Sequence, residues 1–280
     1  MSAREPAAVA ASRRLAVHVQ GIGLLGPGLP NWEEGGKQLL GTAPSINEKT
    51  RVPAPQALPA AERRRAGVAV RAALAIGWEA LAMAGASAQD LATVFTSSGG
   101  DGVNCHEICA TLASDDRAIS PTRFHNSVHN APSGYWSISS GSMAPSSVLC
   151  AHDGSFAAGL LEAVAQVESE QRLVLLLAYD TDYPEPLHGV RPIPDTMGVA
   201  LLLSPARLPG SLGELVVDGG AAFTGDPADA LPDPWLEQVR NAIPAARGLP
   251  LLQALAAGAD RSVVLDYLPD LRLRVRVVPC

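Results

Sequence analysis

The chain of 280 residues is long enough for one large domain or two small ones, and a hydrophobic content of 47% is sufficient for a buried core. Its formal net charge of −7, with no basic run longer than Arg63–Arg65, argues against a nucleic-acid partner. Four unevenly spaced cysteines do not suggest a disulfide framework, and the longest apolar run, Leu173–Ala178, is far too short to span a bilayer. We therefore expect a soluble, cytoplasmic protein without a membrane span.

The N-terminal region contains a strand followed by glycines. Residues 1–14 are rich in alanine and polar side chains, and we expect them to be disordered. A strand begins at Leu15 and is expected to end in a glycine-rich turn over residues 21–28. Gly21 and Gly23 match the start of a dinucleotide-binding fingerprint, but no third glycine opens a helix at the required spacing. A nucleotide cofactor is therefore not expected.

Helices and strands alternate along the rest of the chain, after a proline-dense loop. Helical spacing of apolar residues and short apolar runs distinguish the two kinds of element. We expect helices over 59–84, 103–112, 155–164, 235–243 and 250–257, strands over 92–96, 147–150, 173–178, 198–203 and 214–217, and a β-hairpin formed by 262–265 and 271–278. This alternation predicts an α/β protein with a largely buried sheet.

Two groups of cysteine and histidine residues are candidate metal or proton-transfer sites. Cys105 and Cys109 share a helix face, but His106 points elsewhere and structural zinc requires four ligands, which favours small buried thiols in a packed helix. His125 and His129 form an i, i+4 pair that is able to bind metal or relay protons. Without a neighbouring carboxylate, hydrogen-bonded structural histidines are the preferred interpretation. We expect no metal site.

Residues 144–163 form the strongest candidate for a functional centre. A short strand, Ser147–Cys150, is followed by a turn at Asp153 and Gly154 and then by apolar residues at helical spacing. Such a turn presents a side chain at a helix N-terminus, where free N–H groups and the helix dipole stabilise negative charge. This strand–turn–helix unit is a suitable place for a nucleophile.

Several motifs, taken in order, resemble the N-terminal half of the β-ketoacyl synthases, the condensing enzymes of the thiolase superfamily. The matching strings are VHVQGIGLLGPG, SSGGDG, SPTRFHNSVHNAPSGYWSI and DTMGVALLLSP, and the strand–turn–helix unit corresponds to the nucleophile unit of that family. The resemblance implies an α/β, thiolase-like fold that contains a single N-terminal ketosynthase half with a truncated C-terminal part. Residues 15–220 would form the ketosynthase-like domain, and residues 221–280 a short C-terminal extension that completes the fold.

The reactive residues of the family are missing. Where the resemblance places the nucleophilic cysteine, just before the turn, this chain has Ala151. Cys150 is one residue away and would face the opposite side of a strand, and Ser155 lacks the second glycine of a nucleophile elbow. Ketosynthases also use two histidines in their C-terminal half, whereas no histidine follows His188. The resemblance thus predicts no catalytic residue, with Cys150, His152 and Ser155 as neighbours of a vestigial nucleophile position.

What remains resembles the chain length factors, silent relatives that pair with an active ketosynthase and shape its pocket, in particular the short forms of aryl-polyene and xanthomonadin-type systems. The resemblance implies a heterodimer in which the ketosynthase subunit supplies the reactive groups and the docking of acyl carrier protein, with no cofactor. Expected substrate-tunnel residues are Ser98 on the second glycine turn and, across the dimer, Thr122, Arg123 and Phe124.

Two other functions remain open at this stage. The chain is an independent acyltransferase or thioesterase if Cys150, Ser155 or His152 provides the reactive group. It is a carrier or binding protein if it has no condensing partner.

Overall fold

One mixed β-sheet organises the molecule. The computed structural model describes residues 14–218 and 222–280, so the expected disorder of the N-terminus lies outside the described residues except for Arg14, which begins the first strand. The strands are β1 (Arg14–Leu25), β2 (Ala92–Thr96), β3 (Ser146–Leu149), β4 (Val174–Asp180), β5 (Met197–Ser204), β6 (Gly213–Asp218), β7 (Phe223–Thr224), β8 (Arg261–Leu268) and β9 (Leu271–Val278). Their order across the sheet is β3-β2-β4-β5-β1-β6-β9-β7, with β8 paired to β9. The predicted α/β class and the C-terminal hairpin are confirmed.

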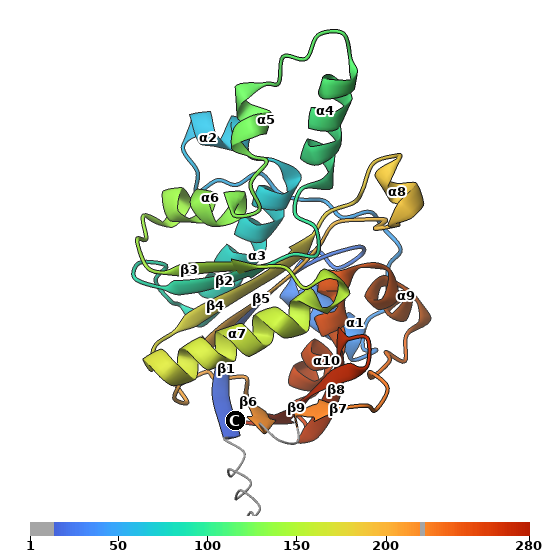
Figure 1. Cartoon of the computed structure of the whole chain (residues 1–280). Helices are drawn as coiled ribbons and strands as arrows, with labels where there is room; N and C mark the ends of the chain where they lie inside the picture. The colour runs from blue at the N-terminus through green and yellow to red at the C-terminus, as the bar shows by residue number, and fades with distance from the viewer. Residues whose placement is uncertain (1–13, 219–221) are drawn as a thin grey trace, which may run out of the picture.

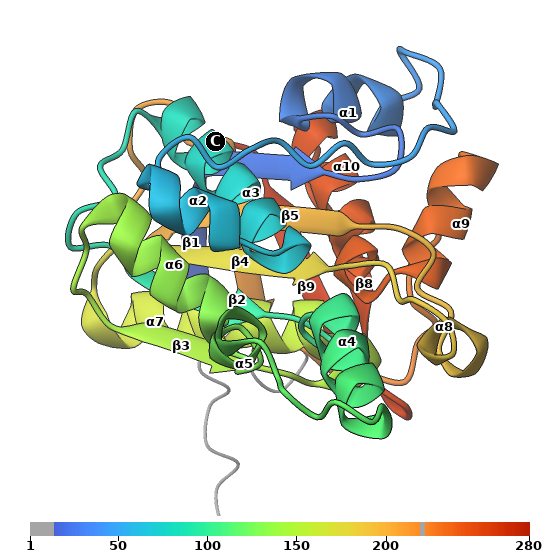
Figure 2. The same ribbon diagram turned by 90° about the horizontal axis from the view of Figure 1, so that it is seen from above.

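Helices cover both faces of this sheet. They are α1 (Trp32–Leu39), α2 (Ala60–Arg65), α3 (Val68–Ala84), α4 (Gly102–Ala113), α5 (Pro121–His125), α6 (Ala131–Ser140), α7 (Ser155–Glu170), α8 (Leu187–Val190), α9 (Pro234–Ala242) and α10 (Leu249–Ala257), with 3-10 turns η1 (His152–Gly154) and η2 (Pro244–Gly248). Helices α3 and α6 lie on one face of the sheet and α7 and α10 on the other (Figures 1 and 2). The core therefore consists of two apolar layers separated by the sheet.

The central strand β4 contributes to both layers because its residues alternate between the two faces. Val174, Leu176 and Ala178 pack in the layer under α7, whereas Leu175, Leu177 and Tyr179 pack in the layer under α3. Every residue of β4 is buried. A strand covered on both faces is expected to be continuously apolar, which explains the run that the sequence shows here.

The first strand extends farther than predicted. Gly21 and Gly23 lie inside β1, so the expected turn over residues 21–28 is wrong in its first half. A Cβ atom at Gly21 would lie 2.1 Å from the carbonyl oxygen of Ala80, and one at Gly23 would lie 1.9 Å from that of Ile76. The two glycines therefore serve the close approach of α3 to the sheet rather than a turn.

The C-terminal segment belongs to the same sheet. Strand β9 pairs antiparallel with β6, and Leu273, Val275 and Val277 of β9 are buried while Arg276 is exposed. Within the described residues, no helix combines the length and apolar character needed to cross a membrane.

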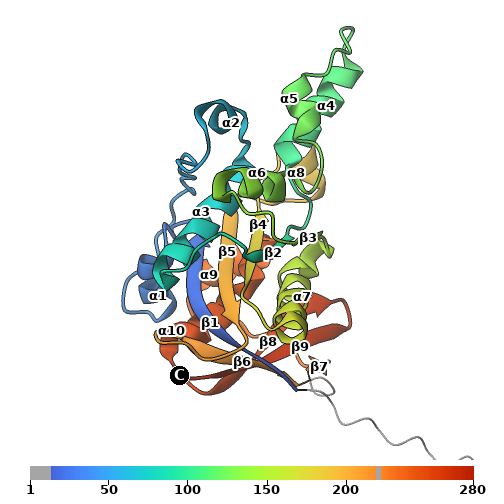
Figure 3. The same ribbon diagram turned by 90° about the vertical axis from the view of Figure 1, so that its left-hand side faces the viewer.

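Residues 102–130, here called the arm, project from this body (Figures 1 and 3). Only Gly102 and Asn104 of α4 are buried. The arm leaves the body at a glycine turn against which Tyr183 packs. A Cβ atom at Gly99 would lie 1.9 Å from the Tyr183 hydroxyl, and one at Gly102 would lie 2.6 Å from its ring. The glycines thus fix where the arm starts.

Candidate functional site

The predicted strand–turn–helix unit is confirmed as β3, η1 and α7. His152 adopts a φ of +50°, which gives the sharp reversal between the strand and the helix. Gly154 lies against the end of β8, where a Cβ atom would be only 2.1 Å from the carbonyl oxygen of Tyr267. Ala151 immediately precedes this turn and is half-buried. The unit has the geometry that presents a nucleophile, and it presents a methyl group.

The two neighbouring nucleophile candidates are held by other groups. Ser155 is 2% exposed, and its hydroxyl donates to the carbonyl of His152 at 2.7 Å while accepting the Ala151 N–H at 3.0 Å. Cys150 is exposed, and its thiol donates to the carbonyl of Ser98 at 3.1 Å. Within the described part of the chain, neither group has a hydrogen bond to an imidazole. Neither group therefore has a neighbouring imidazole base to activate it in the structure described.

A charged cluster lies beside the turn. Asp153 accepts from Arg191 at 2.7 Å and from Arg247 at 3.2 Å. Burial alone would raise the pKa of Asp153, but the hydrogen bond from Arg191 and the charge of Arg247 outweigh it and lower the pKa below its ordinary value. A nitrogen of Arg191 also lies 2.6 Å from His152 Nε2. Because a guanidinium can only donate, His152 Nε2 is already used as an acceptor and is not free to act as a base.

The predicted tunnel residue Ser98 lies in a buried network. Its hydroxyl and N–H donate to Asp180 at 2.6 and 2.9 Å, the Ser97 hydroxyl donates to the same carboxylate at 3.3 Å, and the N–H of Ala245 donates at 2.8 Å. Burial raises the pKa of Asp180, partly offset by these bonds. The network joins the second glycine turn to η2. Ser98 is 6% exposed and is not among the residues that line the cavity described next.

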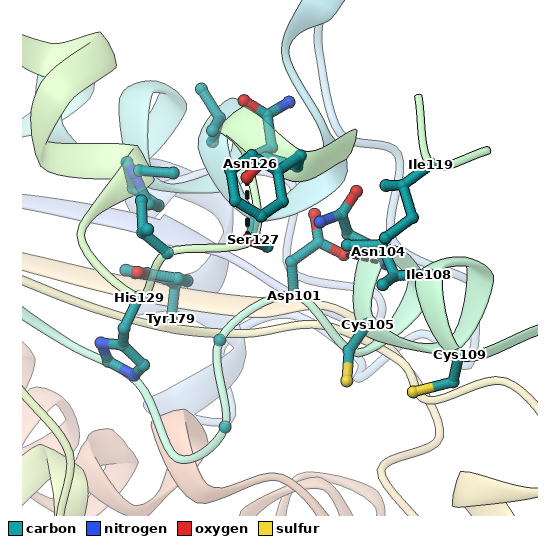
Figure 4. Close-up of a pocket in the computed structure, with 18 of the residues that line it drawn as sticks. Asp101, Asn104, Cys105, Ile108, Cys109, Ile119, Asn126, Ser127, His129 and Tyr179 are labelled. Atoms are coloured by element: carbon teal, nitrogen blue, oxygen red, sulfur yellow. Dashed lines mark hydrogen bonds between the residues drawn. The ribbon is translucent and has the colours of Figure 1, made fainter. Parts of the chain in front are cut away.

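A cavity of about 440 Å³ lies between the arm and the body (Figure 4). Its lining comes from α3, the glycine turn, α4 and the loop after it, α5 and the segment after it, the start of α6, and β4: Ala69, Val70, Gly99, Gly100, Asp101, Asn104, Cys105, Ile108, Cys109, Leu112, Ile119, Phe124, Asn126, Ser127, Val128, His129, Ala131, Pro132 and Tyr179. Of the four predicted tunnel residues, Phe124 lines this cavity. Thr122 and Arg123 line a neighbouring cavity, and Arg123 pairs with Glu107 at 3.3 Å.

The cysteines of α4 correct an expectation. Cys105 and Cys109 are exposed and line the cavity, so their interpretation as buried thiols is wrong. Partial burial, with the neighbouring Cys109, raises the pKa of Cys105, which therefore has little thiolate character. Residues 14–218 and 222–280 contain no group of three or more histidine, cysteine or acidic residues able to hold a metal ion. One sequence signal could have identified the α4 wall of the cavity: the i, i+3 and i+4 spacing of Cys105, Ile108, Cys109 and Leu112 places them on one helix face.

These features define a class of protein. One mixed sheet between two helical layers, with a nucleophile-type turn at the start of α7, is the thiolase-like fold of condensing enzymes. A family model described as the N-terminal domain of β-ketoacyl synthase matches residues 38–224, well over half of the chain. The chain belongs to this β-ketoacyl synthase family.

Solved structures support the same fold. A structure of the ketosynthase ApeO in complex with its chain length factor ApeC from Xenorhabdus doucetiae has a TM-score of 0.70 and 24% identity, covering 94% of this chain and 99% of the matched chain. The ishigamide ketosynthase/chain length factor gives 0.69 at 12% identity, with 95% and 100% covered. A type II acyl carrier protein in complex with its ketosynthase, AntDE:AntF, gives 0.71 at 12% identity, with 96% and 100% covered. No curated protein matches the chain.

Proposed function

We propose that this chain is a non-catalytic, chain-length-factor-like subunit that pairs with an active β-ketoacyl synthase in the cytoplasm and shapes its acyl tunnel. The observation that carries the proposal is Ala151, an inert residue at the reactive position of an otherwise well-formed nucleophile unit. The fold is retained while its reactive group is absent. Such a protein would act through the surface that binds the ketosynthase and through the walls of its cavity. We propose that it takes part in fatty-acid or polyketide-type biosynthesis of the aryl-polyene kind.

The surface around β3 supports a ketosynthase partner. Strand β3 pairs only with β2 in the described sheet, so its outer edge is free to pair with another chain. Large apolar side chains are exposed on α6 and the loop that leads into β3 (Ile138 49%, Met143 93%) and on the arm (Leu112 48%, Phe124 68%, Val128 53%). Their combination with a free strand edge is typical of an obligate interface. Acyl carrier protein would contact the complex through the ketosynthase.

The arrangement of the two chain segments also supports a single working unit. We propose that residues 15–220 are the ketosynthase-like domain and that residues 221–280 complete it. The pairing of β9 with β6 and the hydrogen bond from Ala245 to Asp180 favour this division of roles. An independent acyltransferase or thioesterase has less support, because Ser155 is buried and Cys150 lacks an activating imidazole among the described residues.

Co-expression tests the pairing. Co-expressed with its cognate ketosynthase, the chain should elute as a one-to-one complex, and Phe124→Glu should abolish that complex because a charge is buried at an apolar interface. Leu208→Glu, an exposed residue at 43% on the loop after β5, is the matched control and should leave the complex intact. A well-behaved monomer with no affinity for this ketosynthase would refute the proposal.

Intact-mass analysis tests catalytic silence. Incubated with acyl-loaded carrier protein or cerulenin, the isolated chain should gain no covalent adduct. Ala151→Cys should not restore condensation in the absence of a competent ketosynthase, since no histidine follows His188. An adduct that maps to Cys150 or Ser155 in the unmodified chain would favour the acyltransferase alternative.

Product analysis tests the tunnel. Ile108→Phe adds a ring to the cavity wall and should shorten the products of the reconstituted complex while its assembly is unchanged. Leu208→Phe, at 43% exposure on the loop after β5 and outside the cavity lining, is the control and should leave product length unchanged. An unaltered length distribution with Ile108→Phe would remove this cavity from the tunnel.

A further inference from the structure

The polar groups of the cavity wall are nearly all engaged. Asn104, Asn126 and Ser127 donate to main-chain carbonyls of α2 and α5 at 2.8 to 2.9 Å. Asp101 accepts the N–H of Asn104 at the start of α4 at 2.9 Å. The rest of the lining is mostly apolar or sulfur-bearing. An occupant of this part of the cavity therefore meets few free hydrogen-bonding groups.

Two side chains differ from this pattern. Tyr179, at 0% exposure on β4, has a hydroxyl without a hydrogen-bond partner among the described residues, and the buried Nε2 of His129 likewise has none. Both residues line the cavity. Figure 4 shows them together at one end, with Ile108 and Cys109 of α4 at the other. Burying polar groups without partners is costly, so two of them in one wall indicate that their partners come from an occupant.

We propose that the cavity binds an extended apolar acyl chain whose far end carries an oxygen, a hydroxyl or a carbonyl, that accepts a hydrogen bond from Tyr179 and contacts His129. The proposal rests on the tunnel role above and specifies the chemistry of the chain that enters it. Burial raises the pKa of Tyr179, so its hydroxyl stays protonated and can only be satisfied as a donor by an acceptor on the ligand. His129 donates or accepts according to its tautomer.

The volume and the walls fit this ligand. A cavity of about 440 Å³ is within the range of small-molecule sites. The methylene chain would lie against Val70, Ile108 and Leu112, where it gains burial without polar cost. Gly100 lies beside the His129 ring, since a Cβ atom there would be in van der Waals contact with the ring carbon Cδ2 at 3.4 Å. The polar end is thus formed by residues of three separate segments.

Calorimetry with two unreactive probes tests the proposal on the full chain in its ketosynthase complex. The probes are N-(2-acetamidoethyl)decanamide and its 10-hydroxy derivative. Tyr179→Phe should weaken binding of the hydroxy probe about three- to tenfold, the usual worth of one hydrogen bond, and leave the unsubstituted probe unchanged. Tyr267→Phe removes a phenol hydroxyl outside the cavity and should change neither affinity.

The outcomes are distinguishable. Equal effects of Tyr179→Phe on the affinities of both probes would refute a hydrogen bond to an oxygen at the far end of the chain. If Tyr179→Phe does not fold, His129→Leu provides the same comparison. Ile108→Trp, which fills the cavity, should abolish binding of both probes. If it changes neither affinity, the chain does not enter this cavity, and the tunnel role fails together with the inference. If it abolishes binding while Tyr179→Phe has no selective effect, the tunnel role stands alone.

Discussion

The nucleophile unit and the arm lie close together in the chain but differ in how completely their groups are satisfied. In the nucleophile unit, the Ser155 hydroxyl, the His152 ring and the Asp153 carboxylate all have partners inside the chain. The arm leaves Leu112 and Phe124 exposed and lines a cavity that contains unpartnered polar atoms. A segment whose polar groups all have partners within the chain contributes to the stability of the fold. A segment with exposed apolar side chains and unpartnered polar atoms needs another protein or a ligand to satisfy them.

The largest effect on the free energy of unfolding should come from placing a side chain at Gly154, in the turn between β3 and α7. Gly154→Val places a side chain against the carbonyl oxygen of Tyr267, where a Cβ atom would already be 2.1 Å away, and should lower the free energy of unfolding by about 3 kcal/mol. Gly134→Ala is the control, because a Cβ atom there meets nothing within 4 Å inside α6, and it should raise stability by about 1 kcal/mol. Urea unfolding measures both. Equal stability of the two variants would mean that the turn is less constrained than described.

A smaller loss is expected from the hydroxyl that closes the turn. Ser155→Ala leaves the Ala151 N–H and the His152 carbonyl without this partner and should cost about 1 to 2 kcal/mol. Ser155→Thr retains the hydroxyl and serves as the control for its loss. Loss of activity in a reconstituted complex that still assembles fully with Ser155→Ala would show that the hydroxyl has a chemical role. The nucleophile unit would then not be the purely structural region that we contrast with the arm.

The charge cluster should contribute still less. Asp153 has a pKa lowered from its ordinary 3.8, so its stabilisation is present above that pH and is lost as the pH falls through the folded-state pKa. Its side chain is 41% exposed, and solvent screening limits the loss in Asp153→Asn at pH 7 to less than about 1 kcal/mol. The difference between wild type and variant should shrink toward pH 3. A difference that grows on acidification would contradict the assignment.

The smallest effect on stability belongs to the arm. Phe124→Ser removes a side chain that is 68% exposed and should change the free energy of unfolding by no more than about 0.5 kcal/mol. The same change should improve the solubility of the isolated chain and weaken its complex. A large loss of stability would show that the arm packs against the body more closely than its exposure indicates.

Local patterns predicted the strand–turn–helix unit and the alternation of helices and strands, because both depend on neighbouring residues. The position of Ser98 was not predictable in this way. Its partner Asp180 lies 82 residues away in the sequence, and that contact holds the Ser98 side chain in a buried network. Ser98→Phe is therefore expected to destabilise the fold rather than to shorten a product.

The cavity wall was missed for a related reason. Small thiols are usually buried, so the sequence favours buried side chains at Cys105 and Cys109, but α4 projects from the body and has few neighbours to bury it. Whether a helix is covered depends on where the chain places it, which its own spacing does not reveal. The unpartnered hydroxyl of Tyr179 likewise appears only when the whole wall is assembled.

The carboxylate of Asp180 holds the glycine turn and η2 at the same time, and on the η2 side its partner is the main-chain N–H of Ala245. Because the donor is a main-chain N–H, this hydrogen bond does not depend on which side chain stands at position 245. Ala245 is nevertheless 2% exposed in the core, so segments exchanged from related proteins should graft onto this body at η2 only where they carry a small residue at this position. Proline at position 245 is the exception, since it has no N–H to donate.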